Sequence, residues 1–145
     1  MVYQPKFYYQ RIPLKTEDTR TGKVIRKEQL LVSGVEHPGF KLHPLFKGEN
    51  DSVLEYVLLS AYQGCAYDVS TQSYLLNDEA SVNFETDKLS SVAGAKPISG
   101  EKHSFTIDEA ERLANNRGDG WHIMNMAAHS ADQMLMISEF GMFNG

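Results

Sequence analysis

The chain has 145 residues, of which 41% are hydrophobic and 23% are charged, a composition typical of a soluble globular protein. Its 14 basic and 19 acidic residues give a net charge of −5, which disfavours general binding to the phosphate backbone of nucleic acids. No apolar run approaches the ~18 residues of a membrane span, and the N-terminus lacks the basic start and the apolar centre of a signal peptide.

Two extended segments are predicted at the start of the chain, at residues 6–14 and 24–32, because both are dense in aromatic and branched side chains. The polar segment 16–22 lies between them and ends in glycine, so we expect an antiparallel β-hairpin. Pro5 and Pro13 lie near the ends of the first strand, which is expected for a strand with a free edge.

The middle of the chain is less regular. Two His-Pro pairs in residues 33–46 predict an ordered but irregular segment. Residues 53–60 are nearly all apolar, which predicts a buried strand with both faces covered. Residues 63–104 contain many Ser, Thr, Asn, Asp and Gly residues and are expected to be the least regular stretch.

Two helices are predicted at the C-terminal end. Thr106 is a good N-cap and Glu109 follows three residues later, which completes a capping box. Gly118 is expected at the C′ position of this helix. A second helix is expected over residues 125–140. The sequence therefore predicts an α+β fold, with a small antiparallel sheet, an N-terminal hairpin and two C-terminal helices.

A Gly-Asp-Gly turn separates the two helices and is followed by the single tryptophan. Gly118 and Gly120 allow a close approach of the backbone, so we expect Trp121 to be buried between the two helices and the sheet. Gly118, Gly120, Trp121 and the capping-box residues are therefore assigned structural roles. A fully exposed Trp121 would instead indicate a ligand anchor.

No catalytic or metal-binding pattern emerges from the titratable residues. The five histidines do not form the helical i,i+4 pair of a metalloprotease, and one cysteine excludes a disulfide framework and a multi-cysteine zinc site. Cys65 is a candidate nucleophile, with His103 or His122 as its base, but lone cysteines more often fill small buried spaces. We expect no metal, no cofactor and no enzymatic activity, and keep a cysteine-dependent enzyme as a remote alternative.

Several ordered motifs resemble tail-associated proteins of phages and prophages from gut bacteria. They are Phe-Tyr-Tyr at 7–9, Gly-Phe-Lys-Leu-His-Pro at 39–44, Leu-Ser-Ala-Tyr at 59–62, Lys-Leu-Ser-Ser-Val-Ala-Gly-Ala-Lys-Pro at 88–97, Asn-Asn-Arg-Gly-Asp-Gly-Trp-His-Ile-Met at 115–124, and residues 136–145. Those proteins are in turn similar to the C-type-lectin-like fold shared by formylglycine-generating enzymes and retroelement-diversified phage receptor binders. The formylglycine-generating enzymes depend on active-site cysteines. This chain has one cysteine, so the resemblance does not imply their activity here.

The resemblance implies one domain, 1–145, with an N-terminal hairpin at 1–35 and a lectin-like core at 36–145. It implies a non-enzymatic module of a phage tail, made in the bacterial cytoplasm and carried on the virion, that contacts other tail proteins. A host cell-surface glycan or protein would be its target. Tyr62, Tyr67, Tyr74 and Asn77, in or beside the polar loop 63–83, are the candidate ligand-binding residues, because exposed aromatics are suited to anchoring sugars or proteins. The alternative is a purely structural subunit of tail assembly.

Family members usually continue beyond the position of Gly145 with a Gly-, Asn- and Trp-rich segment that completes the domain. The resemblance therefore predicts that this chain lacks a C-terminal segment of the family. Met142 and Phe143 would be left as exposed apolar residues. Exposed apolar patches drive association, so we expect a homo-oligomer or strand exchange between copies.

Overall fold

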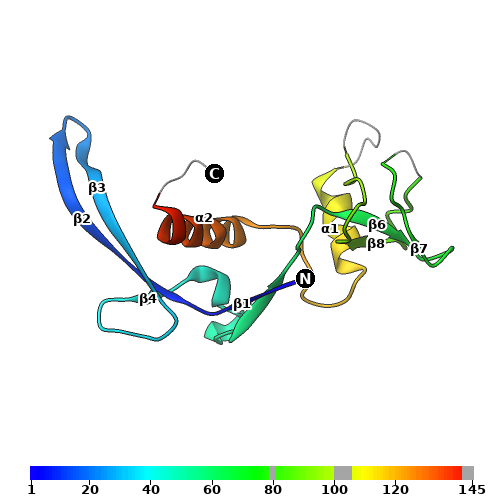
Figure 1. Ribbon diagram of the computed structural model, residues 1–145, viewed down its shortest axis with the longest axis horizontal. Helices are drawn as coiled ribbons and strands as arrows, with labels where there is room; N and C mark the ends of the chain where they lie inside the picture. The colour runs from blue at the N-terminus through cyan, green and yellow to red at the C-terminus, as the bar shows by residue number, and fades with distance from the viewer. Residues whose placement is uncertain (79–80, 100–105, 142–145) are drawn as a thin grey trace. The chain divides into compact units, whose positions relative to one another are not determined.

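The computed structural model describes residues 1–78, 81–99 and 106–141. It confirms an α+β protein with small sheets, an N-terminal hairpin and two C-terminal helices (Figure 1). In chain order the elements are β1 (Val2–Pro5), β2 (Tyr8–Thr19), β3 (Gly22–Ser33), β4 (Lys41–Leu42), the 3₁₀ turns η1 (Pro44–Phe46) and η2 (Glu49–Asp51), β5 (Tyr56–Leu59), β6 (Cys65–Asp68), β7 (Ser73–Tyr74), β8 (Lys88–Ser90), α1 (Ile107–Asn115) and α2 (Met126–Phe140). The strands form the sheets β1–β5, β3–β2–β4 and β7–β6–β8.

The chain divides into two compact units. The first unit consists of Met1–Val2 and Leu58–Asn125, and the second unit consists of Tyr3–Val57 and Met126–Gly145. The two predicted helices therefore belong to different units, and each packs within its own: α1 against β8, and α2 against β3 and η1. These boundaries differ from the predicted parts 1–35 and 36–145, and the single-domain organisation stays a prediction.

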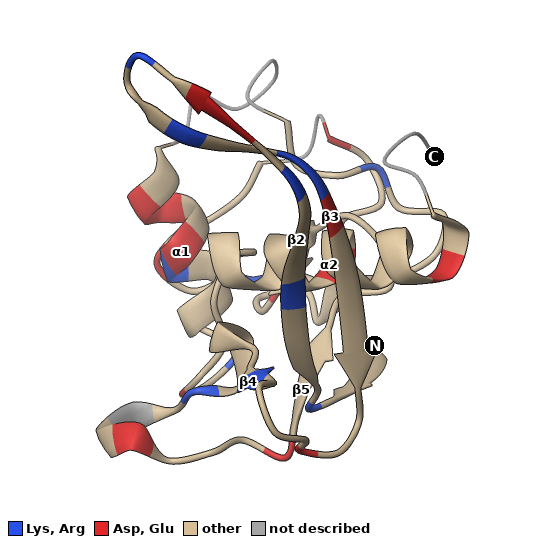
Figure 2. Ribbon diagram, turned by 90° about the vertical axis from the view of Figure 1, so that its left-hand side faces the viewer, with Lys and Arg blue, Asp and Glu red and all other residues tan. Residues whose placement is uncertain are grey.

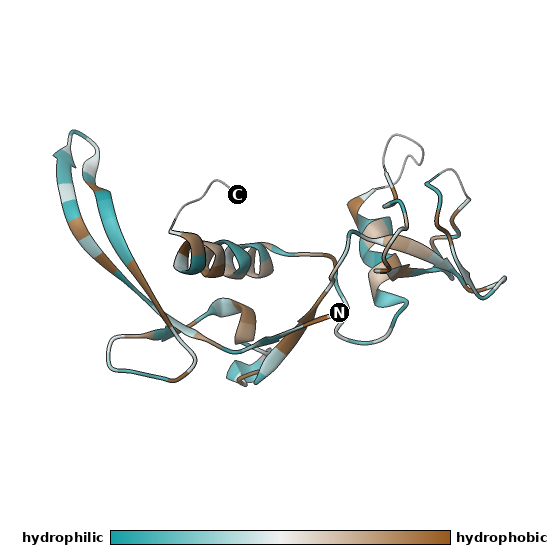
Figure 3. Ribbon diagram, viewed as in Figure 1, coloured by the Kyte–Doolittle hydropathy of each residue, from teal (hydrophilic) through white to brown (hydrophobic). Residues whose placement is uncertain are grey.

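The second unit contains the predicted hairpin, which is confirmed. β2 and β3 pair antiparallel from Tyr8 opposite Ser33 to Thr19 opposite Gly22. The strands are longer than expected, because most of the polar segment 16–22 is paired and the turn is confined to Arg20 and Thr21. Basic and acidic residues lie along both strands (Figure 2), and hydrophilic residues predominate toward the tip (Figure 3).

Cross-strand ion pairs help to fix the register of this hairpin. The Arg11 guanidinium binds the Glu28 carboxylate, and Arg26 Nε lies 2.6 Å from a Glu17 carboxylate oxygen. Opposite charges on facing strands stabilise such a pairing modestly. The register is irregular just after Pro13, where proline has no N–H to donate to the ladder.

The core of the second unit forms where α2 covers the base of the hairpin and η1. Phe7, Phe46 and Ala131 are buried, with Val32, Leu42, Leu45, Val57, Met134 and Leu135 packed around them. Residues 33–46 were expected to be ordered but irregular. After Ser33, the last residue of β3, they contain only the two-residue β4 and η1, and Phe46 is fully buried.

The predicted strand over 53–60 is confirmed only in part, and the prediction that both of its faces are covered is wrong. β5 spans only Tyr56–Leu59, and Tyr56 and Leu58 are 49% and 43% exposed, whereas Val57 and Leu59 are half-buried. This alternation is that of a strand with one covered face. An apolar run does not reveal how many faces of a strand are covered, which is the physical reason for the error.

The first unit contains the sheet β7–β6–β8 and helix α1. Three short strands thus occur within residues 63–104, where the sequence predicted the least regular stretch. β6 is the central strand: Cys65 lies opposite Ser90, and Tyr67 lies opposite both Lys88 and Tyr74. Cys65 and Ala66 of β6 are buried, as are Leu113 and Ala114 of α1, and these side chains supply the core of the unit.

Candidate functional site

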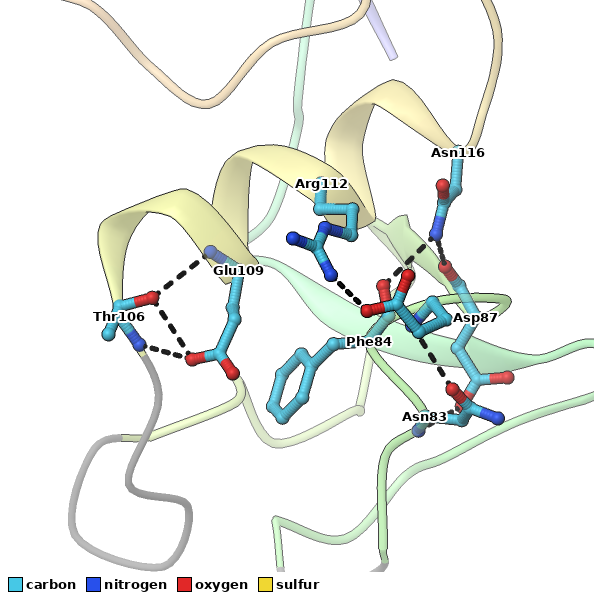
Figure 4. Close-up of polar contacts among 8 residues, drawn as sticks. Asn83, Phe84, Asp87, Thr106, Glu109, Arg112 and Asn116 are labelled. Carbon is cyan, nitrogen blue, oxygen red and sulfur yellow. Dashed lines mark hydrogen bonds and ion pairs between the residues drawn. The ribbon is translucent and has the colours of Figure 1, made fainter.

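Helix α1 is held at its start by the predicted capping box, which the structure confirms (Figure 4). The Glu109 N–H donates to Thr106 Oγ1 at 3.3 Å, and the Thr106 N–H donates to the Glu109 carboxylate at 2.6 Å. These bonds satisfy two backbone donors that a helix start leaves unpaired. They also hold the pKa of Glu109 below its usual value, because the bonds from Thr106 favour the carboxylate form.

The other end of α1 is tied to the turn at residues 83–87 (Figure 4). Asn116 Nδ2 donates to the carbonyl oxygens of Phe84 and Asp87 at 3.3 and 2.8 Å. Arg112 forms an ion pair with Glu85. The buried Asp87 carboxylate accepts the N–H groups of Val69 and Asn83, so it joins this turn to the end of β6. This structural role of Asp87 was not predicted from the sequence.

The Gly-Asp-Gly turn directs Trp121 back toward the end of α1. Gly118 and Gly120 adopt φ values of +135° and +81°, which favour glycine, and the Trp121 N–H lies 3.4 Å from the Gly118 carbonyl oxygen. Because α1 ends at Asn115 with Asn116 as its C-cap, Arg117 occupies C′, and Gly118, which was predicted at C′, lies one residue beyond it. The guanidinium carbon of Arg117 lies 4.4 Å from the centroid of the Trp121 ring, a cation–π contact.

Trp121 is half-buried, so its ring is only partly enclosed, and its predicted place between the two helices and the sheet stays a prediction. The ring belongs to the first unit, and α2 belongs to the second. A guanidinium rather than a hydrophobic side chain covers one face of the ring. The exposure of Trp121 is therefore intermediate between that of a fully buried core residue and that of a fully exposed ligand anchor.

The loop that follows Trp121 is fastened to α1 by Glu111. One oxygen of this carboxylate lies 2.6 Å from His122 Nδ1, and the other accepts the Ile123 N–H at 3.1 Å. The bond from His122 is the main reason that the pKa of Glu111 lies below its usual value. His122 thus has a structural partner.

A pocket of about 240 Å³ lies where these elements meet the sheet. It is lined by two aromatic side chains, one cation, three serines and several apolar groups, namely Trp121, Tyr74, Arg117, Ser60, Ser90, Ser91, Leu89, Val92 and Met1. Aromatic faces beside hydroxyls and one fixed charge are the groups that recognise small polar ligands. This pocket, here called the Arg117 pocket, is the candidate functional site.

Of the four predicted ligand-binding residues, one lines the Arg117 pocket and a second supports it. Tyr74 is 49% exposed and lines the pocket. Tyr67 is half-buried and meets the Tyr74 ring edge-on, with centroids 5.1 Å apart. Tyr62 is 55% exposed, and Asn77 is exposed, but neither lines the pocket.

Two sets of hydrogen bonds, one from Asp68 and one from Ser91, fix the local backbone around these tyrosines. In the β6–β7 turn the Asp68 carboxylate accepts bonds from Ser70 Oγ at 2.7 Å and from the Ser70 and Thr71 N–H groups. Bonds from Ser70 and Thr71 lower the pKa of Asp68 to about 2, so the turn stays intact at neutral pH. Separately, Ser91 Oγ bonds both the N–H and the carbonyl oxygen of Tyr62, each at 2.9 Å.

Sequence reasoning missed Arg117 and the serines of the pocket. Arg117 Nη1 donates to the Leu89 carbonyl oxygen at 2.8 Å and to Ser90 Oγ at 3.0 Å. The available signal was the spacing of Arg117 and Trp121 across a turn with two glycines. Such a turn brings its flanking residues together, but sequence does not show which side chain meets which.

The remaining candidates for chemistry fit catalysis poorly. Cys65 is fully buried, and burial raises the pKa of its thiol, whereas a nucleophilic cysteine requires solvent access and thiolate character.

His103 and the predicted exposed pair Met142 and Phe143 lie outside the described residues. Across residues 1–78, 81–99 and 106–141, no group of three or more His, Cys, Asp and Glu side chains is placed to hold a metal ion. In the same ranges no helix combines the length and apolar character of a membrane span.

A larger hollow of about 370 Å³ lies in the second unit, between the hairpin and α2. Its lining includes Leu30, Met134 and Ile137, and its charged members, Arg11 and Glu28, neutralise each other as an ion pair. This hollow therefore offers apolar contact but no unpaired charge to select a ligand.

No protein-family model, no curated protein and no solved structure matches the chain. The resemblance to lectin-like phage proteins therefore stays an expectation from the sequence. The Arg117 pocket is the firmer basis for a functional proposal.

Proposed function

We propose that the chain is a non-enzymatic binding module of a phage or prophage tail, with a C-type-lectin-like fold, that recognises a host cell-surface glycan or protein. The observation that carries the proposal is that Tyr74 and Trp121, from two distant segments of the sequence, line the same pocket together with Arg117. Aromatic rings stack on the apolar faces of sugars and anchor protein contacts, and serine hydroxyls bond to polar groups at the rim.

The size of the pocket is consistent with a small recognition element. At about 240 Å³ it lies just below the ~300–1,000 Å³ typical of sites for drug-sized ligands. One sugar ring or one side chain of a surface protein fits this space better than a whole oligosaccharide. Further affinity would come from several copies of the module on one tail.

Binding of the purified chain to host cells and to an array of bacterial glycans tests this proposal. Tyr74→Ala should weaken binding, because this exposed side chain lines the pocket and its removal leaves the core intact. Phe140→Ala is the matched control: Phe140 is 68% exposed and belongs to the second unit, so binding should be unchanged.

Two outcomes would contradict the proposal. Failure to bind host cells, array glycans and host-surface proteins, together with co-purification of other tail proteins, would favour a purely structural assembly subunit. Equal weakening by Tyr74→Ala and Phe140→Ala would place the contact surface elsewhere.

A further inference from the structure

The guanidinium of Arg117 is held on two sides. Its Nη1 donates to the Leu89 carbonyl oxygen and to Ser90 Oγ, which uses both hydrogens of that nitrogen. Its central carbon lies over the Trp121 ring, 4.4 Å from the ring centroid. A cation held in this way loses little further conformational freedom when it binds a ligand, which favours affinity.

The hydrogen bonds of this guanidinium are incomplete within the described residues. Both of its bonds leave from Nη1, while the buried Nε has no hydrogen-bond partner there. A buried donor without a partner is unfavourable, and native proteins usually provide one from the protein, water or a ligand. Because Nε is enclosed by protein atoms and Nη1 is engaged, a ligand carboxylate in the pocket would bond to the remaining nitrogen, Nη2, whose two N–H groups can donate to it.

The side chains of the pocket carry one positive charge, on Arg117, and no negative charge among the described lining residues. Asp119 lies close in sequence but is exposed and does not line the pocket. A net charge of −5 works against extended polyanions, so the ligand that suits this site has a single, localised anionic group.

Tyr74 supplies an aromatic ring beside this cation. One face of Trp121 is taken up by Arg117, whereas Tyr74 is half exposed and is supported edge-on by Tyr67. The lining serines add hydroxyl groups that donate to or accept from the hydroxyls of a sugar. Aromatic ring, hydroxyls and guanidinium together match a pyranose that carries a carboxylate.

We infer that the Arg117 pocket binds an acidic sugar, with the carboxylate on the guanidinium of Arg117 and the pyranose ring against Tyr74. This inference rests on the proposed function and names the ligand class of the same site. The carboxylate bonds to a cation that the protein has already oriented, and a neutral sugar has no charge to pair with that cation.

The single tryptophan of the chain makes the test direct, because its fluorescence reports on this pocket without a label. The probes are the methyl glycosides of glucuronic, galacturonic and N-acetylneuraminic acids, each titrated beside a neutral sugar of the same ring. We expect at least one acidic sugar to bind about tenfold more tightly than its neutral partner, since bonds to charged groups are stronger by roughly that factor. Added salt should reduce the difference.

Variants test whether Arg117 causes the preference for the acidic sugar. Arg117→Gln should remove the preference for the acidic sugar, and Arg117→Lys should weaken it, because lysine keeps the charge but not the planar pair of donors. Arg112→Gln is the matched control on the same helix: Arg112 pairs with Glu85 and does not line the pocket, so the preference should persist.

The possible results distinguish an error in the ligand class from an error in the proposed binding function. Equal affinity for acidic and neutral sugars, or a preference that survives Arg117→Gln, would overturn the inference and leave a sugar-binding module in place. Binding to host cells or to array ligands without a response to any acidic probe would also overturn it alone. Silence in the cell, array and protein-binding assays would overturn both.

Discussion

His43 lies in the aromatic core of the second unit and is 1% exposed. Its Nδ1 accepts the Leu45 N–H at 3.2 Å, and its Nε2 lies 3.4 Å from Ser130 Oγ. The ring centroid of Phe7 is 4.9 Å away, and Tyr9 and Phe46 pack nearby. Burial disfavours the charged imidazolium and so lowers the pKa of His43 from its ordinary value of 6.5.

This burial predicts a loss of stability in mildly acidic solution. As the pH falls below about 6.5, the unfolded chain binds a proton at His43 that the folded chain resists. The free energy of unfolding therefore decreases until the pH reaches the folded-state pKa, by about 1.4 kcal/mol for each tenfold difference in proton affinity. Urea denaturation at pH 7.5 and pH 5 measures this decrease. His43→Asn retains a side-chain acceptor for the Leu45 N–H but does not titrate, so identical pH dependence in both proteins would contradict the prediction.

Cys65 gives a second test at the scale of one residue. Its side chain is fully buried and its thiol pKa is raised by desolvation, so the folded chain should not react with Ellman's reagent at neutral pH. In denaturant one thiol per chain should react, because the sequence has one cysteine. Rapid reaction of the native protein would show an accessible thiol and would revive the cysteine-dependent enzyme as an alternative.

Helix α1 is the element whose stability depends most clearly on a local device. Thr106→Ala removes the acceptor for the Glu109 N–H and should lower the free energy of unfolding by about 1 kcal/mol, within a usual range of roughly 0.5–2. Thr106→Ser retains the oxygen and is the matched control. Chemical denaturation followed by tryptophan fluorescence measures both variants, since Trp121 lies in the same unit. An unchanged midpoint for Thr106→Ala would show that α1 does not need its cap.

The elements that the sequence predicted well are those with local causes. The hairpin follows from two dense apolar segments and a polar turn, and α1 follows from Thr106, Glu109 and a helical apolar stripe. The short strands β6, β7 and β8 were missed because their pairing joins residues far apart, such as Cys65 and Ser90, through polar loops. Strands of two to four residues leave little periodic signal.

In the candidate site, too, the features with local causes were predicted and those that depend on tertiary contacts were not. Tyr74 was predicted as a contact residue because it lies in a polar, tyrosine-bearing loop, and Gly118 and Gly120 were predicted to form a tight turn. The partial exposure of Trp121 and the role of Arg117 were not predicted. Both depend on the contact of two side chains across that turn, and this contact is set by three-dimensional geometry rather than by residue type.

At the scale of the whole molecule, the homo-oligomer stays a prediction, and the exposed strand β3 is one surface where it can be tested. This strand has 12 residues and lies at the edge of the sheet β3–β2–β4. Val24 and Ile25, near its outer end, are 37% and 49% exposed. A long edge strand with exposed apolar side chains is a surface on which another chain can pair, although charged residues along it weaken that tendency. We therefore expect copies of the chain to associate through the outer part of the hairpin.

Light scattering over a dilution series measures this association. The average mass should exceed that of one chain, 16.3 kDa, at high concentration and should fall on dilution. Ile25→Lys should shift the equilibrium toward the monomer, because it places a charge where an apolar contact is expected. Lys23→Gln, on the same strand, is the control and should not reduce association. A mass of 16.3 kDa at every concentration would show that the chain is a monomer and that the charged residues of β3 are sufficient to protect its edge.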